Sequence, residues 1–241
     1  ARVFLVDGTY DQAFDLCIEA ADRFGWYNRN TGFNPYMSEG KKTAAYEIAE
    51  QLHWEAPDAV IVSVGDGCII GGVFKGFRDL LALGWIDKMP RLIGVQAAGA
   101  NFLADAWERG EDVLTKAPMD AASVADSIVA GLPRDRLKAM RAVKFTEGGF
   151  VEVSDDEILA AIPRLARTTG VFAEPAAAAA YAGLVGAAAE DLIQRKDRVV
   201  ILSTGSGLKD VRGAMQGVSA AGIEGTLIPP SLDAVAAAIE G

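Results

Sequence analysis

The segment Val60–Gly72, VIVSVGDGCIIGG, carries the pattern best suited to binding a charged ligand. Its β-branched residues predict a buried strand, and the glycines at positions 65 and 67 predict a tight turn that leads into a helix. Such a turn presents backbone N–H groups at the positive end of the helix dipole, so it can hold a phosphate without a cationic side chain. A tight connection that binds nothing is the alternative.

Two other phosphate motifs do not fit this turn. A dinucleotide-binding fingerprint requires glycines spaced G-x-G-x-x-G and an acidic residue that closes the next strand. Here the third glycine falls at Gly71, and the next predicted strand ends in Gln96. A P-loop requires Lys followed by Ser or Thr after the glycines, and this turn lacks that pair. The mismatches disfavour NAD and exclude a P-loop.

A second group of hydroxyl and glycine residues, STGSGLKD, occupies Ser203–Asp210 directly after a predicted strand. Ligands of open α/β sheets bind beyond the carboxyl ends of the strands. A hydroxyl at this place could therefore bond to a ring nitrogen or a phosphate of a cofactor that lies across the strand ends. A loop with capping serines is the alternative.

Both segments belong to a pattern in which predicted strands alternate with predicted helices. The expected strands are Val3–Val6, Ala59–Val64, Arg91–Gln96 and Val199–Leu202. The expected helices are Tyr10–Phe24, Ser38–Leu52 with Ser38 as its N-cap, Ile70–Leu83, Arg134–Ala142, Glu157–Thr168 capped by Asp155 and Asp156, Ala176–Ala189 and Leu232–Ile239. The alternation predicts an α/β fold built on a largely parallel, twisted sheet with helices on both faces.

The amino-acid composition limits the kinds of molecule that the protein is expected to bind. The formal net charge of −10 disfavours nucleic acid, because such binding depends on clustered Lys and Arg. No apolar run approaches the roughly 18 residues of a membrane span, so we expect no membrane partner. Cys17, Cys68 and the single histidine, His53, suit neither a disulfide scaffold nor a zinc site, and no metal is expected. A small molecule is the expected partner, and the expected location is cytoplasmic.

Several ordered segments resemble the threonine synthases. Asn34–Thr43, NPYMSEGKKT, is similar to the N-P-x-R-x-E-G-x-K-T stretch of that family, and Glu174–Ala179, EPAAAA, to its E-P-A-S-A-A stretch. The phosphate-loop strand, Pro90–Gly99 and Ser154–Ile158 come between them, and Thr204–Asp210 follows, as in the family. The likeness covers about residues 3–212. The chain is identified as a member of the threonine synthase-like, pyridoxal-phosphate-dependent enzymes.

This resemblance implies fold type II, which is shared with the tryptophan synthase β subunit and the serine and threonine dehydratases. Residues 1–30 would be a remnant of the small lobe, and residues 31–241 the large lobe that binds pyridoxal 5′-phosphate. The residues that correspond to the family's cofactor contacts are Gly65, Asp66, Gly67, Cys68 and Ile69 for the phosphate and Thr204 for the pyridine nitrogen. A neutral hydroxyl would leave the pyridine largely unprotonated, which favours elimination and replacement.

The sequence also departs from the family. The lysine that anchors the cofactor and the Ser-Gly-Asn loop that holds the substrate carboxylate lie N-terminal to the matched segments, and neither is present. We therefore name no catalytic residue and expect a fragment of a longer gene product that is inactive in isolation. The start at Ala1, with neither an initiator Met nor a signal peptide, leads to the same expectation.

Two substitutions bear on the substrate. Met37 and Ile69 stand where the family's Arg and Asn help to hold the phosphate of O-phosphohomoserine, so that substrate is expected to bind less well. The charge of Asp66 is compatible with a nearby phosphate only if its side chain points away or pairs with a cation.

We expect the parent enzyme to catalyse β- or γ-elimination or replacement on an amino acid, as a homodimer. A dehydratase or a cysteate-synthase-like enzyme is one alternative, and a noncatalytic phosphate-binding module is another.

Overall fold

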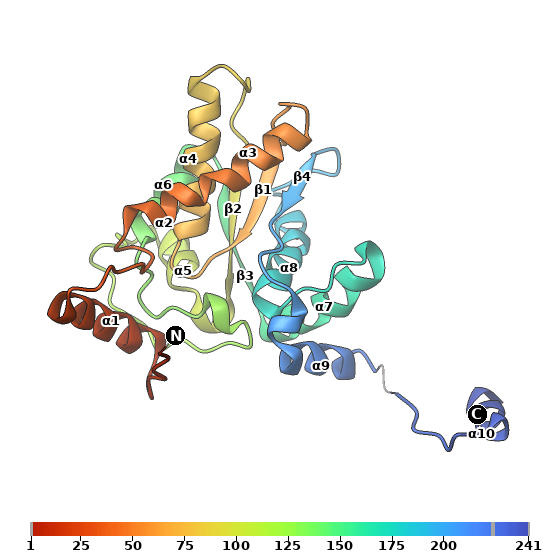
Figure 1. Ribbon diagram of the computed structural model, residues 1–241. Helices are drawn as coiled ribbons and strands as arrows, with labels where there is room; N and C mark the ends of the chain where they lie inside the picture. The colour runs from red at the N-terminus through yellow and green to blue at the C-terminus, as the bar shows by residue number, and fades with distance from the viewer. Residues whose placement is uncertain (1, 223–224, 241) are drawn as a thin grey trace.

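The computed structural model describes residues 2–222 and 225–240 and is built on a four-stranded sheet (Figure 1). The strands are β1 (Ala59–Ser63), β2 (Arg91–Ala97), β3 (Gly149–Val153) and β4 (Val199–Ile201). Their order is β3-β2-β1-β4, and every neighbouring pair is parallel. The predicted α/β class and parallel sheet are therefore confirmed, and all carboxyl ends of the strands lie along one edge.

Helices cover both faces of the sheet. Successive side chains of a strand point to opposite faces, and the apolar residues of β1 are therefore buried on both sides. Val60 and Val62 pack into one hydrophobic cluster, and Ala59 and Ile61 into the other. The first cluster contains residues of α3 (Lys42–Gln51), α4 (Cys68–Ala82), α5 (Phe102–Arg109) and α6 (Arg136–Phe145). The second contains residues of α7 (Asp155–Thr169) and α8 (Pro175–Ala189). Figure 1 shows the two groups on opposite sides of the strands.

The remaining helices lie around this body. They are α1 (Tyr10–Phe24), α2 (Pro35–Gly40), α9 (Val211–Ala220) and α10 (Leu232–Glu240). Helix α9 packs against α7, and α10 stands apart near the C-terminus (Figure 1). None of the helices within the described ranges has the length and apolar character needed to cross a membrane.

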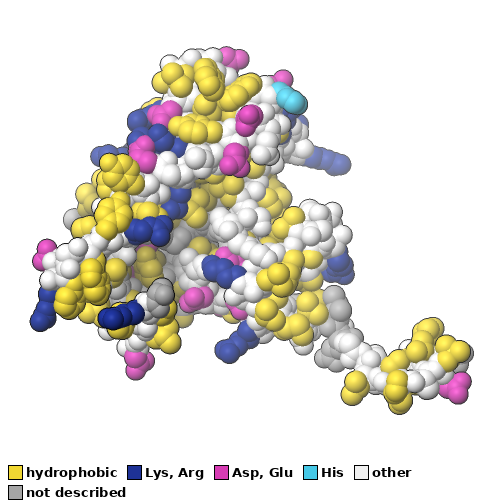
Figure 2. Space-filling view, viewed as in Figure 1, with side chains coloured by type: hydrophobic (Ala, Val, Ile, Leu, Met, Phe, Trp, Pro, Cys, Tyr) yellow, Lys and Arg dark blue, Asp and Glu magenta, His cyan; other side chains and the backbone are white. Residues whose placement is uncertain are grey.

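The expected strand Val3–Val6 is wrong, since residues 2–6 form no regular secondary structure. A strand is held by a neighbour, and these residues pair with none of the described strands. Their large apolar side chains are exposed instead, Leu5 at 94%. Figure 2 shows apolar side chains gathered over this N-terminal region and α1.

Two of the predicted helix N-caps are also wrong. The expected helix Ser38–Leu52 is two helices, α2 and α3, and Asn34 rather than Ser38 caps the first by accepting a hydrogen bond from the Tyr36 N–H at 3.0 Å. Ser154 caps α7 through a capping box with Glu157, in place of the expected Asp155 and Asp156. Strand β3 was not predicted, because its five residues follow a weakly periodic segment.

Candidate cofactor-binding site

The predicted glycine turn joins β1 to α4 at the carboxyl edge of the sheet. Gly67 is the N-cap of α4 and has φ 92°. In this left-handed conformation glycine is unstrained, whereas a residue with a side chain is strained. Within the part of the chain that the structure describes, no side chain caps α4. Because the first N–H groups of a helix have no partner within it, this end of α4 offers backbone donors to a ligand.

A cavity of about 560 Å³ opens at this end of α4. All five predicted phosphate-loop residues, Gly65 to Ile69, line it, together with residues of α1, Thr31, Lys41 and the segment 126–130. Thr31, Lys41 and that segment were not predicted to be part of a site. Only Lys41 carried a signal, because it lies within the family-like stretch Asn34–Thr43.

Asp66 turns its carboxylate to three donors from distant parts of the chain. Its Oδ2 accepts hydrogen bonds from the hydroxyls of Tyr10 and of Thr31, the latter at 2.9 Å, and its Oδ1 accepts one from the Arg134 N–H at 2.9 Å. Burial, followed by the hydrogen bond with Asp66, raises the pKa of the Tyr10 phenol. Hydrogen bonds therefore stabilise the carboxylate of Asp66, which forms no ion pair with the residues that the structure describes.

Cys68, the first residue of α4, contributes a buried thiol. Its Sγ lies 3.6 Å from the Ser38 hydroxyl, and burial raises the pKa of the thiol. The protonated form is thus favoured at neutral pH, which leaves the backbone N–H of Cys68 as its means of holding an anion.

Three lysines lie between the start of α2 and the end of α4, and Lys41 is the one that lines the cavity. Its Nζ donates a hydrogen bond to the Met37 carbonyl at 3.2 Å. Lys42 pairs with Asp79 at 3.0 Å, and Lys75 pairs with Glu39. These two ammonium groups are held by carboxylates on α2 and α4, outside the residues that line the cavity.

Thr204 lies beyond the end of β4, along the same edge of the sheet as the glycine turn. The neighbouring Leu202 N–H bonds to the Ile61 carbonyl of β1 at 3.0 Å, which fixes the two chain segments side by side. Thr204 itself is exposed and is not among the residues that line the 560 Å³ cavity. Thr204 therefore lies at the same edge of the sheet as the glycine turn but outside the cavity that the turn lines.

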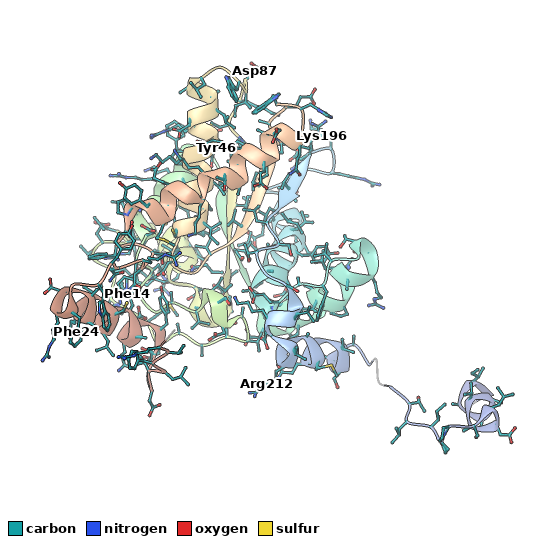
Figure 3. All side chains as sticks on the ribbon, viewed as in Figure 1. Phe14, Phe24, Tyr46, Asp87, Lys196 and Arg212 are labelled. Carbon is teal, nitrogen blue, oxygen red and sulfur yellow. The ribbon has the colours of Figure 1, made fainter. Side chains whose placement is uncertain are left out.

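The loop that carries Thr204 is anchored by Lys209. The Lys209 Nζ lies 3.1 Å from the carboxylate of Glu174, a residue 4% exposed, and donates to the Ser127 hydroxyl at 2.9 Å. Glu174 makes no side-chain cap to α8, so its carboxylate serves this ion pair rather than the helix N-terminus. A second hollow of about 510 Å³ lies here, and Asp126 and Ser127 line both hollows. Figure 3 marks Arg212, which also lines the second one.

Comparisons with known proteins identify this architecture. Residues 1–205 match the family model described as pyridoxal-phosphate dependent enzyme. The chain belongs to this family. Threonine synthase from Methanocaldococcus jannaschii is 39% identical over 218 residues, which are 90% of this chain and 53% of that protein. Threonine synthase from Methanosarcina acetivorans is 36% identical over 241 residues, covering 100% of this chain and 58% of that protein. The resemblance to threonine synthases is confirmed, and the chain spans little more than half the length of these relatives.

Solved structures agree with the fold. Threonine deaminase isoform 2 from Solanum lycopersicum superposes with a TM-score of 0.71 at 23% identity, covering 91% of this chain and 60% of that one. A pyridoxal 5′-phosphate-dependent aspartate racemase gives a TM-score of 0.71 at 18% identity, covering 88% and 62%. At these identities the likeness shows the fold alone, that of the fold type II enzymes.

The residues at the cavity fit the phosphate of this family's cofactor, pyridoxal 5′-phosphate. The uncapped start of α4 supplies donors, and a Cβ on Gly65 would lie 3.0 Å from the Ile128 Cα, so the turn approaches the facing backbone as closely as a glycine allows. Among the described residues, no group of three His, Cys, Asp or Glu side chains could hold a metal ion.

Proposed function

We propose that this chain forms the cofactor-binding lobe of a threonine synthase-like enzyme that catalyses β- or γ-elimination or replacement on an amino acid. The observation that carries the proposal is the uncapped N-terminus of α4, which opens on a 560 Å³ cavity in a chain of the pyridoxal-phosphate family. Bound pyridoxal phosphate supplies an electron sink for such reactions.

The residues of this chain would bind and orient the cofactor. The N–H groups from Gly67 to Ile69 would hold the phosphate. The Asp66 carboxylate would remain hydrogen-bonded to the hydroxyls of Tyr10 and Thr31. Thr204, one strand away, would face the pyridine nitrogen with a neutral hydroxyl. The division into a small-lobe remnant, residues 1–30, and a large lobe, residues 31–241, is part of the same proposal.

The substrate is an amino acid with a leaving group on its side chain. Ile69 lines the cavity with an apolar side chain, and the half-buried Met37 is uncharged, so neither supplies a charged or hydrogen-bonding side chain for a substrate phosphate. This observation favours a second candidate, a dehydratase or cysteate-synthase-like reaction. A noncatalytic phosphate-binding module is the contrasting possibility. We also propose a homodimer in the cytoplasm, as expected from the sequence.

The test uses the complete gene product that carries this chain beside the isolated 241-residue chain. We expect both to bind pyridoxal phosphate, and only the complete product to retain it covalently after borohydride treatment, as measured by intact mass. Assays with O-phosphohomoserine, serine and threonine would then distinguish the synthase from the dehydratase. Absence of cofactor binding by the complete product contradicts the proposal, and binding without turnover of any amino acid favours the noncatalytic module.

A further inference from the structure

Ser63 carries a buried hydroxyl for which the described residues supply no partner. Four buried side-chain atoms lack a hydrogen bond within the described residues, namely Asn28 Nδ2, Ser63 Oγ, Arg134 Nε and Asp135 Oδ2. Ser63 alone of these four residues lines the cavity at the start of α4. The hydroxyl that lacks a hydrogen-bond partner therefore belongs to a residue beside a cavity that could hold a ligand.

The surroundings of Ser63 give its hydroxyl no other role. Ser63 is the last residue of β1 and is 2% exposed, and the four residues before it, AVIV, are aliphatic. Its backbone pairs with Val95 in the parallel ladder, so the strand does not need the side chain. An unpaired buried hydroxyl costs free energy. A ligand in the cavity would offset this cost.

The position of Ser63 indicates which kind of ligand. It stands two residues before Gly65, so its hydroxyl and the uncapped N–H groups of α4 border one cavity. The oxygens of Asp66, the nearest acid along the chain, are already engaged by Tyr10, Thr31 and the Arg134 N–H. A set of neutral donors at a helix N-terminus suits an anion with several acceptor oxygens.

We propose that the Ser63 hydroxyl donates a hydrogen bond to the phosphate of the bound cofactor and so extends the phosphate site from the turn onto the end of β1. This inference rests on the proposed function, since it takes the anion to be the phosphate of pyridoxal phosphate. Ser63 lies within the segment Val60–Gly72, but the phosphate contacts predicted from the sequence are only Gly65 to Ile69.

Ser63→Ala tests the proposal in the complete gene product. We expect its affinity for pyridoxal phosphate, measured by quenching of tryptophan fluorescence, to fall about tenfold, because one hydrogen bond to a charged group is lost. Affinity for pyridoxal, which has no phosphate, should stay unchanged. The ligand-free variant should melt at the same temperature as the wild type or higher, because an unpaired buried hydroxyl has been removed.

Thr146→Val is the matched control. The buried Thr146 hydroxyl accepts from the Leu92 N–H at 3.0 Å and donates to the Ala142 carbonyl at 2.8 Å, away from the cavity. Its loss should lower the melting temperature of the ligand-free protein and leave cofactor affinity intact.

The outcomes separate the two proposals. Wild-type affinity for pyridoxal phosphate in Ser63→Ala would overturn the role of Ser63 and leave the proposed function standing. Destabilisation of the ligand-free variant as large as that of Thr146→Val, with equal losses of pyridoxal and pyridoxal phosphate binding, would also overturn it, because the hydroxyl would then be structural. If the wild type binds neither pyridoxal phosphate nor inorganic phosphate, both proposals fail.

Discussion

The hydroxyl of Tyr10, at the start of α1, donates a hydrogen bond to the carboxylate of Asp66, in the turn between β1 and α4. The two residues lie 56 positions apart in the sequence. A second contact supports the first, since Arg134 stacks on the Phe14 ring of α1 and pairs with Asp11 at 3.1 Å. Figure 3 shows Phe14 on the side of α1 that faces the body. The position of α1 is therefore linked to the proposed phosphate loop.

Tyr10→Phe removes the hydroxyl and leaves Asp66 with two donors. We expect the free energy of unfolding to fall by about 1 kcal/mol, less than the roughly 1.5–3 kcal/mol of a hydrogen bond to a charged group, because Tyr10 is 44% exposed. Cofactor affinity should fall as well, since the turn is less firmly held. Urea denaturation and fluorescence titration measure the two effects. Tyr46→Phe is the control, because the Tyr46 hydroxyl bonds Asp79 away from the cavity.

The hydrogen bond between Tyr10 and Asp66 makes the stability of the protein depend on pH in the alkaline range. Burial and the hydrogen bond to Asp66 raise the pKa of folded Tyr10, whereas an unfolded tyrosine ionises near pH 10. Above about pH 10 the unfolded chain thus releases a proton that the folded protein keeps, so this stabilisation is complete below about pH 10 and declines as the pH rises. Urea midpoints between about pH 9 and about pH 11 should fall more steeply for the wild type than for Tyr10→Phe. Parallel curves would contradict the assignment.

Gly67→Ala should damage both stability and cofactor binding. Gly67 has φ 92°, which is unfavourable for alanine, and the new Cβ would lie 2.8 Å from the Ala139 Cβ. We expect a loss of about 2–3 kcal/mol in the free energy of unfolding. Gly84→Ala is matched to it, since φ is 71° there and the described residues place no other atom within 4 Å of the added carbon. That variant should lose about 1 kcal/mol and bind pyridoxal phosphate normally. Equal binding losses in both variants would argue against a role for the turn.

The two cysteines should differ in reactivity. Cys17 is exposed, whereas the Cys68 thiol is buried and its pKa is raised by burial. At neutral pH iodoacetamide should label Cys17 at least about tenfold faster, as followed by peptide mass spectrometry. Pyridoxal phosphate should slow Cys68 further, because this residue lines the cavity. Equal labelling rates in the folded protein, or no protection by the cofactor, would contradict this placement, and the urea-unfolded chain provides the reference rate.

The sequence alone predicted the features that depend on neighbouring residues. The aliphatic run before Gly65 and the helical spacing over Tyr10–Phe24 both gave elements that the structure contains, because burial on a sheet and on one helix face imposes fixed periods of apolar residues. The family-like segments predicted the cofactor. The same local reasoning erred at Val3–Val6, where a β-forming composition has no neighbouring strand, and at Ser38, because capping depends on which residue adopts the extended conformation before the helix.

The tertiary structure decided what surrounds the turn. Residues 10, 31 and 134 meet at Asp66, because β1 lies inside the sheet and α1 folds back onto its carboxyl edge. Ser63, beside the cavity, has no hydrogen-bond partner among the described residues. No pattern within a short window of sequence encodes these contacts. They join positions that are far apart along the chain, and their geometry is set by how strands and helices pack.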